Sequence, residues 1–179
     1  RAVTDAKDLR KRFDDAGVTL TSYDVPFAAD FTDDEITRVF EMGQALGVEV
    51  VTSSTRVSLA PRLQPFAAKA GMRVGYHNHT KDFNRIDGEY WWNRFADLTS
   101  KDVILQFDTG NASEAEGVTP QSFIQRNAGR TISMQVKPFS KKNPDAYLGD
   151  DELDWPAIMT ASESVGGIEW YIIEYEREG

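Results

Sequence analysis

Both histidines of the sequence, His77 and His79, stand two positions apart at the end of a short apolar run. Residues 74–76 are typical of a β-strand that follows a helix, because Gly71 stands where a glycine commonly ends one. Side chains alternate along a strand, so we expect His77 and His79 on one face and Asn78 on the other. Two imidazoles on one face predict a metal or proton-transfer site, and hydrogen-bonded histidines at a polar strand end are the alternative.

Three later apolar runs also end in residues that could do chemistry. They end at Asp108, at Gln135 with Lys137, and at Glu174. Asp108 has the alternative of a turn-former or helix cap, Gln135 that of a hydrogen-bonded core amide, and Lys137 that of a surface residue. Glu174 resists such an explanation because a buried carboxylate needs a partner. Together these strand ends favour a site whose nitrogen and oxygen ligands suit Mn²⁺, Mg²⁺, Co²⁺ or Zn²⁺.

The elements that must position these residues alternate regularly along the chain. Six strand-like runs, centred near residues 21, 50, 76, 105, 134 and 172, are separated by helical patterns. Near-continuous apolar strands alternating with helices indicate a parallel α/β sheet, either a doubly wound open sheet or a (β/α)₈ barrel. No glycine-rich phosphate loop follows any run, which weakens the nucleotide-binding open sheet. A barrel would bring the carboxyl ends of its strands to one mouth, where the polar residues could meet.

Local signals set further expectations between the strands. We expect residues 80–89 to form a loop with a turn at Asp87-Gly88, and residues 138–154 to form a long polar loop. The helical spacing of Trp91 and Trp92 favours packing in the core or outer ring over stacking on a sugar. Beyond Glu174, the carboxylates of Glu176 and Glu178 are expected to be solvated.

Composition limits the class of protein and its partners. A chain of 179 residues with 40% hydrophobic and 11% aromatic residues predicts one globular domain. The net charge of −9 argues against nucleic acid or an anionic membrane as the main partner. No apolar run approaches the roughly 20 residues that span a bilayer. The absence of cysteine excludes disulfides and cysteine nucleophiles, and leaves both a cytoplasmic and an exported location open.

Four motifs, taken in order, resemble those of the sugar phosphate isomerase/epimerase family, which belongs to the xylose-isomerase-like TIM barrels. They are Gly75-Tyr76-His77-Asn78-His79, Phe107-Asp108-Thr109-Gly110-Asn111, Gln135-Val136-Lys137 and Ile173-Glu174-Tyr175-Glu176, with the segment 149–155 resembling the loop before the last helix. The resemblance implies a (β/α)₈ TIM-barrel type for residues 1–179 as a single, partial domain. About six strand-helix units would be present, two fewer than a complete barrel needs. The missing two strands would precede Arg1, so we expect an N-terminally truncated or incomplete chain.

The resemblance also implies one divalent metal ion, held by His77, Asp108, Gln135 and Glu174. His77 stands where many members have glutamate. Gln135 stands where the usual motif has histidine, and Pro138 replaces the aspartate of that motif. A glutamine carbonyl is neutral and a weaker ligand than imidazole. Asn111, in turn, stands where some epimerases have histidine.

The activity implied is that of a metal-dependent isomerase or epimerase acting on a small-molecule sugar or keto-sugar, by proton abstraction next to a carbonyl. Glu174 and Asp108 are the expected ligands, with either of them a candidate base. His79 is a candidate base or substrate contact, and Lys137 a stabiliser of developing oxyanion charge. The alternatives are a keto-sugar dehydratase or β-eliminase on the same metal site, and a sugar-binding protein with a decayed site. The acidic charge argues against a DNA-repair endonuclease on the same barrel. A homo-oligomer remains an option.

Overall fold

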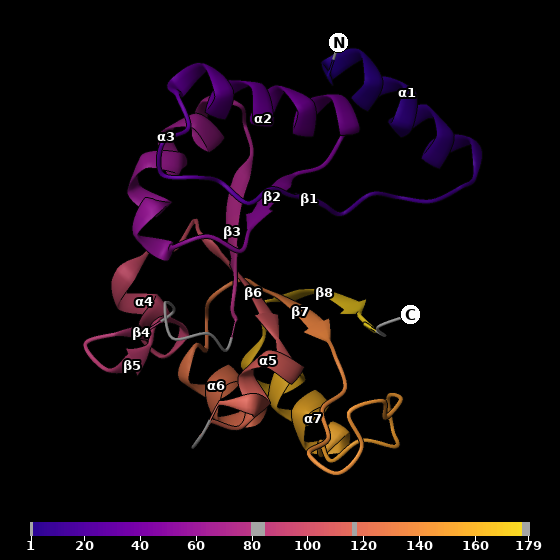
Figure 1. Cartoon of the computed structure of the whole chain (residues 1–179), viewed down its shortest axis with the longest axis vertical. Helices are drawn as coiled ribbons and strands as arrows, with labels where there is room; N and C mark the ends of the chain where they lie inside the picture. Colours follow the sequence, from indigo (N-terminus) through magenta and orange to yellow (C-terminus); the bar gives the residue numbers. More distant parts are fainter. Residues whose placement is uncertain (1, 80–84, 116–117, 177–179) are drawn as a thin grey trace. The chain divides into compact units, whose positions relative to one another are not determined.

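The computed structural model describes residues 2–79, 85–115 and 118–176 (Figure 1). The chain divides into two compact units, Arg1–Tyr76 and His77–Gly179. Strands and helices alternate in both units. The single domain predicted for residues 1–179 stays a prediction.

Three parallel strands in the order β1-β2-β3 form the sheet of the first unit. Its elements are α1 (Ala2–Asp15), β1 (Ser22–Asp24), α2 (Asp33–Leu46), β2 (Val50–Ser53), η1 (Val57–Leu59), α3 (Ala60–Lys69) and β3 (Arg73–His77). Strand β3 ends at the first residue of the second unit, so it delivers His77 to that unit. The strands and α-helices of this unit were expected from the apolar periodicity, whereas the short 3-10 helix η1 was not.

Helix α2 shows how local sequence sets the ends of an element. Thr32 is its N-cap, and a capping box joins the Thr32 side chain to the backbone of Glu35 while the Glu35 carboxylate accepts from the Thr32 backbone. These hydrogen bonds from Thr32 lower the pKa of Glu35. Gly47 ends the helix with φ of 69°, a left-handed conformation that glycine adopts without steric cost. The apolar stripe between these ends, which includes Ile36 and Phe40, is buried.

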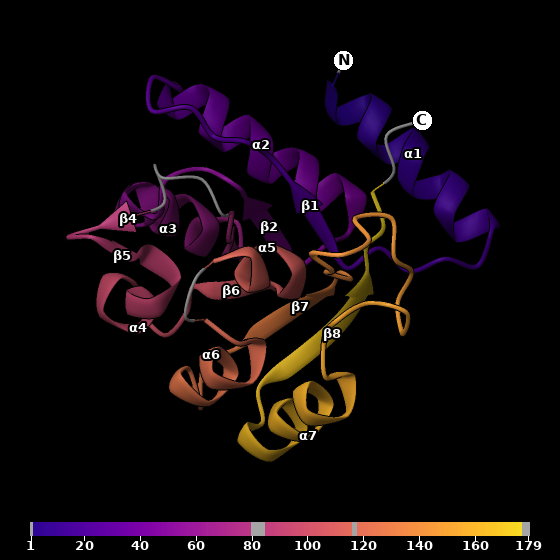
Figure 2. The same cartoon turned by 60° about the horizontal axis from the view of Figure 1, so that its bottom comes forward.

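The second unit also contains three parallel strands, in the order β6-β7-β8. Its elements are β4 (Arg85–Ile86), β5 (Glu89–Tyr90), η3 (Trp91–Arg94), α4 (Phe95–Leu98), β6 (Ile104–Asp108), α5 (Thr109–Glu114), α6 (Pro120–Arg126), β7 (Ile132–Val136), α7 (Trp155–Val165) and β8 (Ile168–Ile173). Helices α6 and α7 lie on one face of these strands in both views (Figures 1 and 2).

Side-chain alternation separates the two faces of this sheet. On the helix side, Phe107 of β6 stacks on Phe123 of α6 with ring centroids 4.3 Å apart. Asp108 follows Phe107, so its side chain lies on the opposite face. Gln135 of the neighbouring strand pairs in register with Asp108, and this face therefore carries polar side chains. Lys137 directly follows β7, and Glu174 directly follows β8. The sheet therefore presents its chemical groups at the carboxyl ends of its strands, on the face away from α6 and α7.

The structure corrects some local expectations. The segment expected to be a loop contains the two-stranded ribbon β4-β5, whose turn has φ of 53° at Asp87 and 84° at Gly88. Residues after Asp108 form helix α5 instead of a simple turn. The predicted core position of Trp91 and Trp92 is confirmed, because both are buried.

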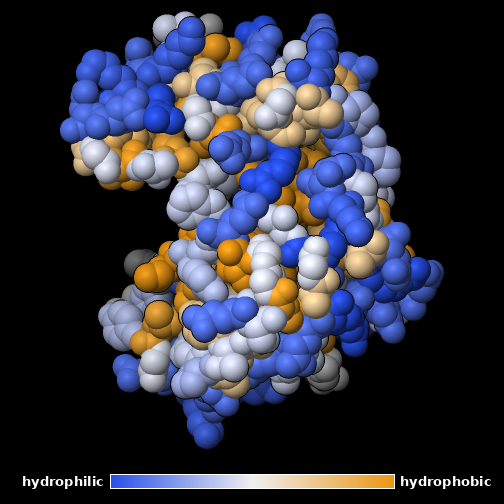
Figure 3. Space-filling model, turned by 180° about the vertical axis from the view of Figure 1, so that it is seen from behind, coloured by the Kyte–Doolittle hydropathy of each residue, from blue (hydrophilic) through white to orange (hydrophobic). Residues whose placement is uncertain are grey.

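The surface is mostly polar. Figure 3 shows a face on which hydrophilic side chains predominate and hydrophobic ones form smaller patches. Strand β8 is an exception, with Trp170, Tyr171 and Ile173 among the exposed large hydrophobic residues. None of the helices in the described ranges combines the length and the hydropathy that crossing a bilayer requires.

Candidate active site

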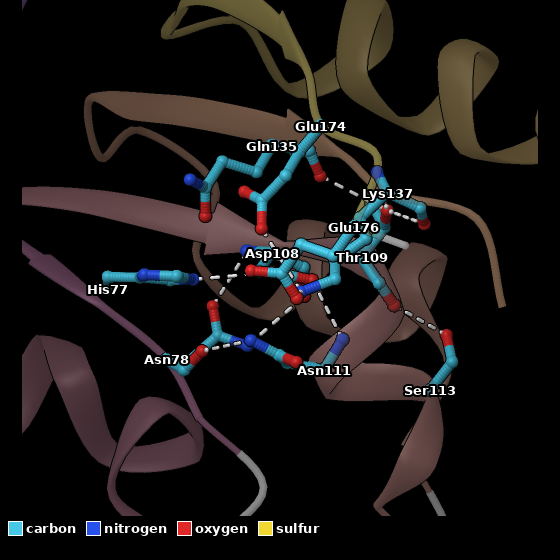
Figure 4. A network of polar contacts seen from close by, with 10 residues as sticks. All are labelled: His77, Asn78, Asp108, Thr109, Asn111, Ser113, Gln135, Lys137, Glu174 and Glu176. Atoms are coloured by element: carbon cyan, nitrogen blue, oxygen red, sulfur yellow. Dashed lines mark hydrogen bonds and ion pairs between the residues drawn. The ribbon is translucent and has the colours of Figure 1, made fainter. Parts of the chain in front are cut away.

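Asp108 lies at the centre of a polar network in the second unit (Figure 4). Its carboxylate is fully buried. One oxygen, Oδ1, accepts a hydrogen bond of 2.7 Å from the backbone of Asn111 and caps helix α5. The other, Oδ2, lies 3.3 Å from His77 Nε2 and 3.6 Å from Lys137 Nζ. Asp108 therefore caps helix α5, which was one of the alternatives left by the sequence, while its second oxygen faces His77 and Lys137.

Asn78 is bonded to the backbone of Asp108 at the end of β6, within the second unit. Its side-chain Oδ1 accepts from the backbone N–H of Asp108 at 2.7 Å, and its Nδ2 donates to the carbonyl of Asp108 at 3.1 Å. Asn111 adds a hydrogen bond of 3.1 Å from its side chain to the carbonyl of Asn78. Asn78 is fully buried, so these bonds satisfy an amide that water cannot reach. These hydrogen bonds also fix Asp108 relative to His77, because His77 directly precedes Asn78 in the chain.

Lys137 connects three carboxylates. Its ammonium donates to Glu174 Oε1 at 3.0 Å and to Glu176 Oε2 at 2.9 Å, in addition to facing Asp108. Thr109 fixes the backbone of this lysine, since its Oγ1 accepts from the N–H of Lys137 at 3.0 Å and donates to the carbonyl of Lys137 at 2.8 Å. The ammonium thus has a defined place among the carboxylates.

The protonation state of Lys137 follows from these neighbours. Its burial alone would lower the pKa, but the negative charge of Asp108 and the hydrogen bonds to Glu176 and Glu174 outweigh burial, and the net effect raises the pKa of Lys137 above its ordinary value. Lys137 is consequently an ammonium ion at neutral pH. It can stabilise negative charge, and it cannot act as a general base there.

The two histidines lie against each other. Their ring centroids are 4.6 Å apart at an interplanar angle of 40°, so both imidazoles are on one side, as the strand alternation predicts. Strand β3 ends at His77, and His79 therefore stands just beyond the strand. His77 reaches Asp108 directly, whereas His79 borders the network through His77.

Gln135 occupies a position beside Asp108 on the neighbouring strand. Its Oε1 is buried, and within the described part of the chain it has no hydrogen-bond partner. The alternative of a hydrogen-bonded core amide is therefore wrong for this oxygen. Figure 4 shows the amide on the same side of the network as His77 and Asp108. A buried carbonyl oxygen without a donor is an available ligand for a cation.

Glu176 departs from the sequence-based expectation. Its side chain is 73% exposed, in keeping with a solvated carboxylate, yet it accepts a hydrogen bond from Lys137. Glu174 is less exposed, at 19%, and Lys137 is the partner that its burial requires. Glu178 lies outside the described residues.

No family model matches the sequence, and no curated protein matches it. Among solved structures, a xylose isomerase domain protein from Planctomyces limnophilus matches with a TM-score of 0.73 and 14% identity, over 97% of this chain and 76% of that chain. The fold is that of the xylose isomerase-like TIM barrels. A D-tagatose 3-epimerase-like protein matches with a TM-score of 0.69 and 15% identity, over 95% of this chain and 75% of that one.

A third solved structure, the probable 3-DHS dehydratase AsbF from Bacillus anthracis, has a TM-score of 0.70 and 10% identity, over 96% of this chain and 76% of that one. These matches confirm the barrel type that the sequence predicted. In xylose isomerase-like TIM barrels, as in TIM barrels generally, side chains at the carboxyl ends of the strands face the mouth of the barrel. The residues around Asp108 lie at that end of β6, β7 and β8 in this chain.

Parts of this site fit a divalent metal ion. Two ligands of one such ion, at bond lengths of about 2.1 Å and angles near 90–110°, lie roughly 3.0–3.4 Å apart. The separation of 3.3 Å between His77 Nε2 and Asp108 Oδ2 falls in that range. The unpartnered Oε1 of Gln135 adds a third donor nearby. Within the described residues, no three His, Cys, Asp or Glu side chains form a metal-binding group by themselves.

Three residues of this network were missed as site residues by sequence reasoning. They are Asn78, Thr109 and Glu176. Strand alternation placed Asn78 on the face opposite the histidines, and its amide bonds to the backbone of Asp108 and not to the carboxylate. The available signal was a run of polar residues directly after a buried strand, since buried amides and hydroxyls require partners.

Proposed function

We propose that this site belongs to an enzyme that isomerises or epimerises a sugar or keto-sugar by removing a proton next to a carbonyl. The observation that carries the proposal is the ammonium of Lys137, which lies 3.0 Å from the carboxylate of Glu174 and 3.6 Å from that of Asp108. A cation beside a carboxylate is the combination that removes a proton and stabilises the resulting oxyanion. The fold and the printed names of the isomerase and epimerase-like neighbours support this reaction class.

The proposal includes one divalent ion held by His77, Asp108, Gln135 and Glu174. When bound, such an ion polarises the carbonyl and its neighbouring hydroxyl. The imidazole of His77 and the carboxylate of Asp108 would hold it from one side, because their donor atoms already face each other. Gln135 would supply its unpartnered carbonyl oxygen. In this arrangement Glu174 would share its negative charge between the ion and Lys137.

The chain's own residues would divide the remaining work. Glu174 accepts the proton from the carbon next to the carbonyl, since its carboxylate is partly accessible and Lys137 holds it in place. Lys137 stays protonated and stabilises the negative charge that develops on the substrate oxygen. His79, next to His77, contacts the substrate. Asn78 and Thr109 keep Asp108 and Lys137 in place through the backbone.

Proton abstraction can be tested without knowing the final product. The protein is incubated with each D-ketohexose in D₂O, and deuterium incorporation next to the carbonyl is followed by NMR, with and without added Mn²⁺ or Co²⁺. We expect exchange with at least one ketohexose, and its loss in Lys137→Met and Glu174→Gln. Glu163→Gln, an exposed change on α7, is the matched control and should keep wild-type exchange. A folded wild-type protein that exchanges no proton with any ketohexose would contradict the proposal.

A dehydratase is the second candidate, and the similarity to a probable 3-DHS dehydratase favours keeping it. The same abstraction next to a carbonyl would then be followed by departure of a hydroxyl from the β-carbon, as water, with formation of a carbon–carbon double bond. The two reactions differ in their products. Ultraviolet absorption of a conjugated enone identifies dehydration, whereas a new sugar signal without such absorption identifies isomerisation. If a sugar binds and neither product forms, the decayed sugar-binding protein is the better description.

A further inference from the structure

A pocket of about 320 Å³ lies beside the loop of residues 138–154 in the second unit. Its apolar lining includes Phe139 and Tyr175. Two lysines and two glutamates complete the wall, and their charges balance: Glu114, Lys137, Lys141 and Glu176. A cavity of about 150 Å³ already holds a benzene molecule, so this pocket has room for a large side chain. Balanced charges and apolar walls favour an uncharged occupant, because an uncompensated charge is costly to bury.

The same loop carries an exposed apolar tip next to this pocket. The loop tip consists of Tyr147 and Leu148, which are 52% and 44% exposed. The ring of Tyr147 stacks on that of Tyr175, a residue of the pocket wall, with centroids 5.0 Å apart. The hydroxyl of Tyr175 also donates to the carbonyl of Asp145 at 3.0 Å. The loop tip and the pocket are therefore held side by side on one surface.

Hydrogen bonds keep this loop in shape. Glu152 joins its two arms, because its backbone N–H donates to the carbonyl of Phe139 at 2.9 Å and its Oε2 accepts from the N–H of Lys141 at 2.7 Å. At the loop tip, the N–H of Asp150 donates to the carbonyl of Tyr147 at 2.9 Å. Figure 1 shows the loop standing out beside α7. A braced loop presents its tip to a partner without the entropic cost of ordering the chain on binding.

The charged side chains next to the loop tip and those next to the pocket have opposite signs. Asp145 and Asp150, both exposed, flank the loop tip in the sequence. Lys141 lines the pocket, and the side chain of the neighbouring Lys142 is 89% exposed. A chain with a net charge of −9 needs such pairing before two copies can approach each other. One surface thus carries both halves of a complementary contact, which is what an interface between identical partners requires.

We infer that a second copy of this chain docks on this surface, in a twofold dimer in which the loop tip of each copy enters the pocket of the other. Twofold symmetry makes each contact occur twice, with the aspartates beside each loop tip facing Lys141 and Lys142 of the other copy. A contact confined to two loops is small, so the dimer is weak and concentration-dependent.

The dimer would also reach the candidate active site. The pocket includes Lys137 and Glu176, which are bonded to each other in the network around Asp108. Leu148 of the second copy would therefore lie against the pocket side of Lys137 and keep water from that side of the site. The inference goes beyond the proposed reaction and does not depend on it, because deuterium exchange tests the reaction separately.

Sedimentation velocity over a series of protein concentrations measures the dimer. We expect a wild-type dimer that weakens as NaCl is added, because salt screens the charges at its rim. Leu148→Asp should raise the dimer dissociation constant by about tenfold or more, since it places a charge in an apolar contact. Leu9→Asp is the matched control, because Leu9 on α1 is 41% exposed, against 44% for Leu148. The control should keep the wild-type dissociation constant.

Charge reversal tests the twofold arrangement. Lys141→Glu combined with Lys142→Glu should weaken the dimer, and so should Asp145→Lys combined with Asp150→Lys, because like charges then meet in both contacts. An equimolar mixture of the two double variants should form heterodimers, since opposite charges face each other again in both contacts. A fluorescent label on one of the two variants detects the heterodimer in the same sedimentation experiment.

Three results would overturn the inference: no wild-type dimer at up to about 1 mM protein, equal effects of Leu148→Asp and Leu9→Asp, or no heterodimer from the mixed variants. A dimer that resists Leu148→Asp and is lost in Ile173→Asp would also overturn it, because the interface would then lie on β8, where Ile173 is 75% exposed. Circular dichroism checks that each variant is folded, as expected for changes at exposed residues.

Discussion

The ammonium of Lys137 lies 3.0 Å from Glu174 Oε1, although 37 positions separate the two residues in sequence. Each residue directly follows a parallel strand, β7 or β8, and the register that pairs Val136 with Ile173 brings them together. The same ammonium faces the fully buried carboxylate of Asp108. Charges in such a place are stable only while they compensate one another, which makes the lysine the residue to change first.

Lys137→Met is expected to cost both activity and stability. Loss of one preorganised charge at a developing oxyanion reduces turnover by about 10²- to 10³-fold, and leaving Asp108 and Glu174 without their cation lowers the free energy of unfolding by about 1–3 kcal/mol. Deuterium exchange and urea unfolding measure the two effects. Lys142→Met, which removes an exposed ion pair with Glu152, is the control and should change neither. Equal stability of the two variants would show that Lys137 is not needed to compensate the carboxylates.

Asn78→Leu is expected to loosen the attachment of residue 78 to the end of β6 within the second unit. The variant loses both hydrogen bonds to the backbone of Asp108 and leaves those two buried groups unsatisfied. We expect a loss of about 2–4 kcal/mol in the free energy of unfolding, since each unsatisfied buried group costs about 1–3 kcal/mol. Asn111→Ala removes a single hydrogen bond to the same loop and should cost less. Denaturant unfolding measures the free energy of unfolding of both variants. A larger loss in Asn111→Ala than in Asn78→Leu would contradict this account.

Gly110 allows the backbone after β7 to approach helix α5. A Cβ atom there would lie 2.9 Å from Cγ of Lys137 and 3.1 Å from the carbonyl oxygen of Pro138. Gly110→Ala should therefore displace the lysine, and activity should fall by about tenfold or more, because small misplacements of catalytic groups are costly. Ser113→Ala changes the same helix without adding atoms near Lys137 and should retain activity. Full activity of Gly110→Ala would mean that the lysine position is not critical.

Gln135→Met is expected to act in opposite directions on stability and metal binding. The change removes a buried carbonyl oxygen without a partner, so the metal-free protein should gain up to about 1 kcal/mol in the free energy of unfolding. It also removes a proposed ligand, so Mn²⁺ or Co²⁺ should stabilise the variant less than the wild type. Thermal unfolding with and without each metal measures both effects. Gln135→His should restore or increase metal stabilisation, and identical metal responses in all three proteins would exclude Gln135 as a ligand.

The raised pKa of Lys137 makes a prediction about pH. A group whose pKa is higher in the folded than in the unfolded state stabilises fully below its unfolded pKa, and this contribution disappears as the pH rises through the folded pKa. The difference in melting temperature between wild type and Lys137→Met should therefore stay constant from about pH 6 to 9 and narrow only above about pH 10.4, the ordinary lysine value. Narrowing between pH 6 and 9 would show that the pKa of Lys137 is lowered instead.

Much of the fold was predictable from local sequence. Apolar runs separated by capped helices predicted every parallel strand, because burial on both faces demands continuous hydrophobic residues. Helix ends are also encoded locally, as the caps Thr32 and Gly47 of α2 show. The ribbon β4-β5 and helix α5 were missed, since both are short and their hydrogen bonds depend on neighbouring segments.

The sequence by itself determined which residues end the strands: His77, Asp108, Gln135, Lys137 and Glu174. It did so because strand ends are marked locally, where an apolar run stops. Only the tertiary structure decided how these groups meet, namely that Lys137 lies among three carboxylates and that the Oε1 of Gln135 has no partner within the described residues. Strand register and the backbone contacts of Asn78 and Thr109 set those distances, and both arise from contacts between residues far apart in the chain.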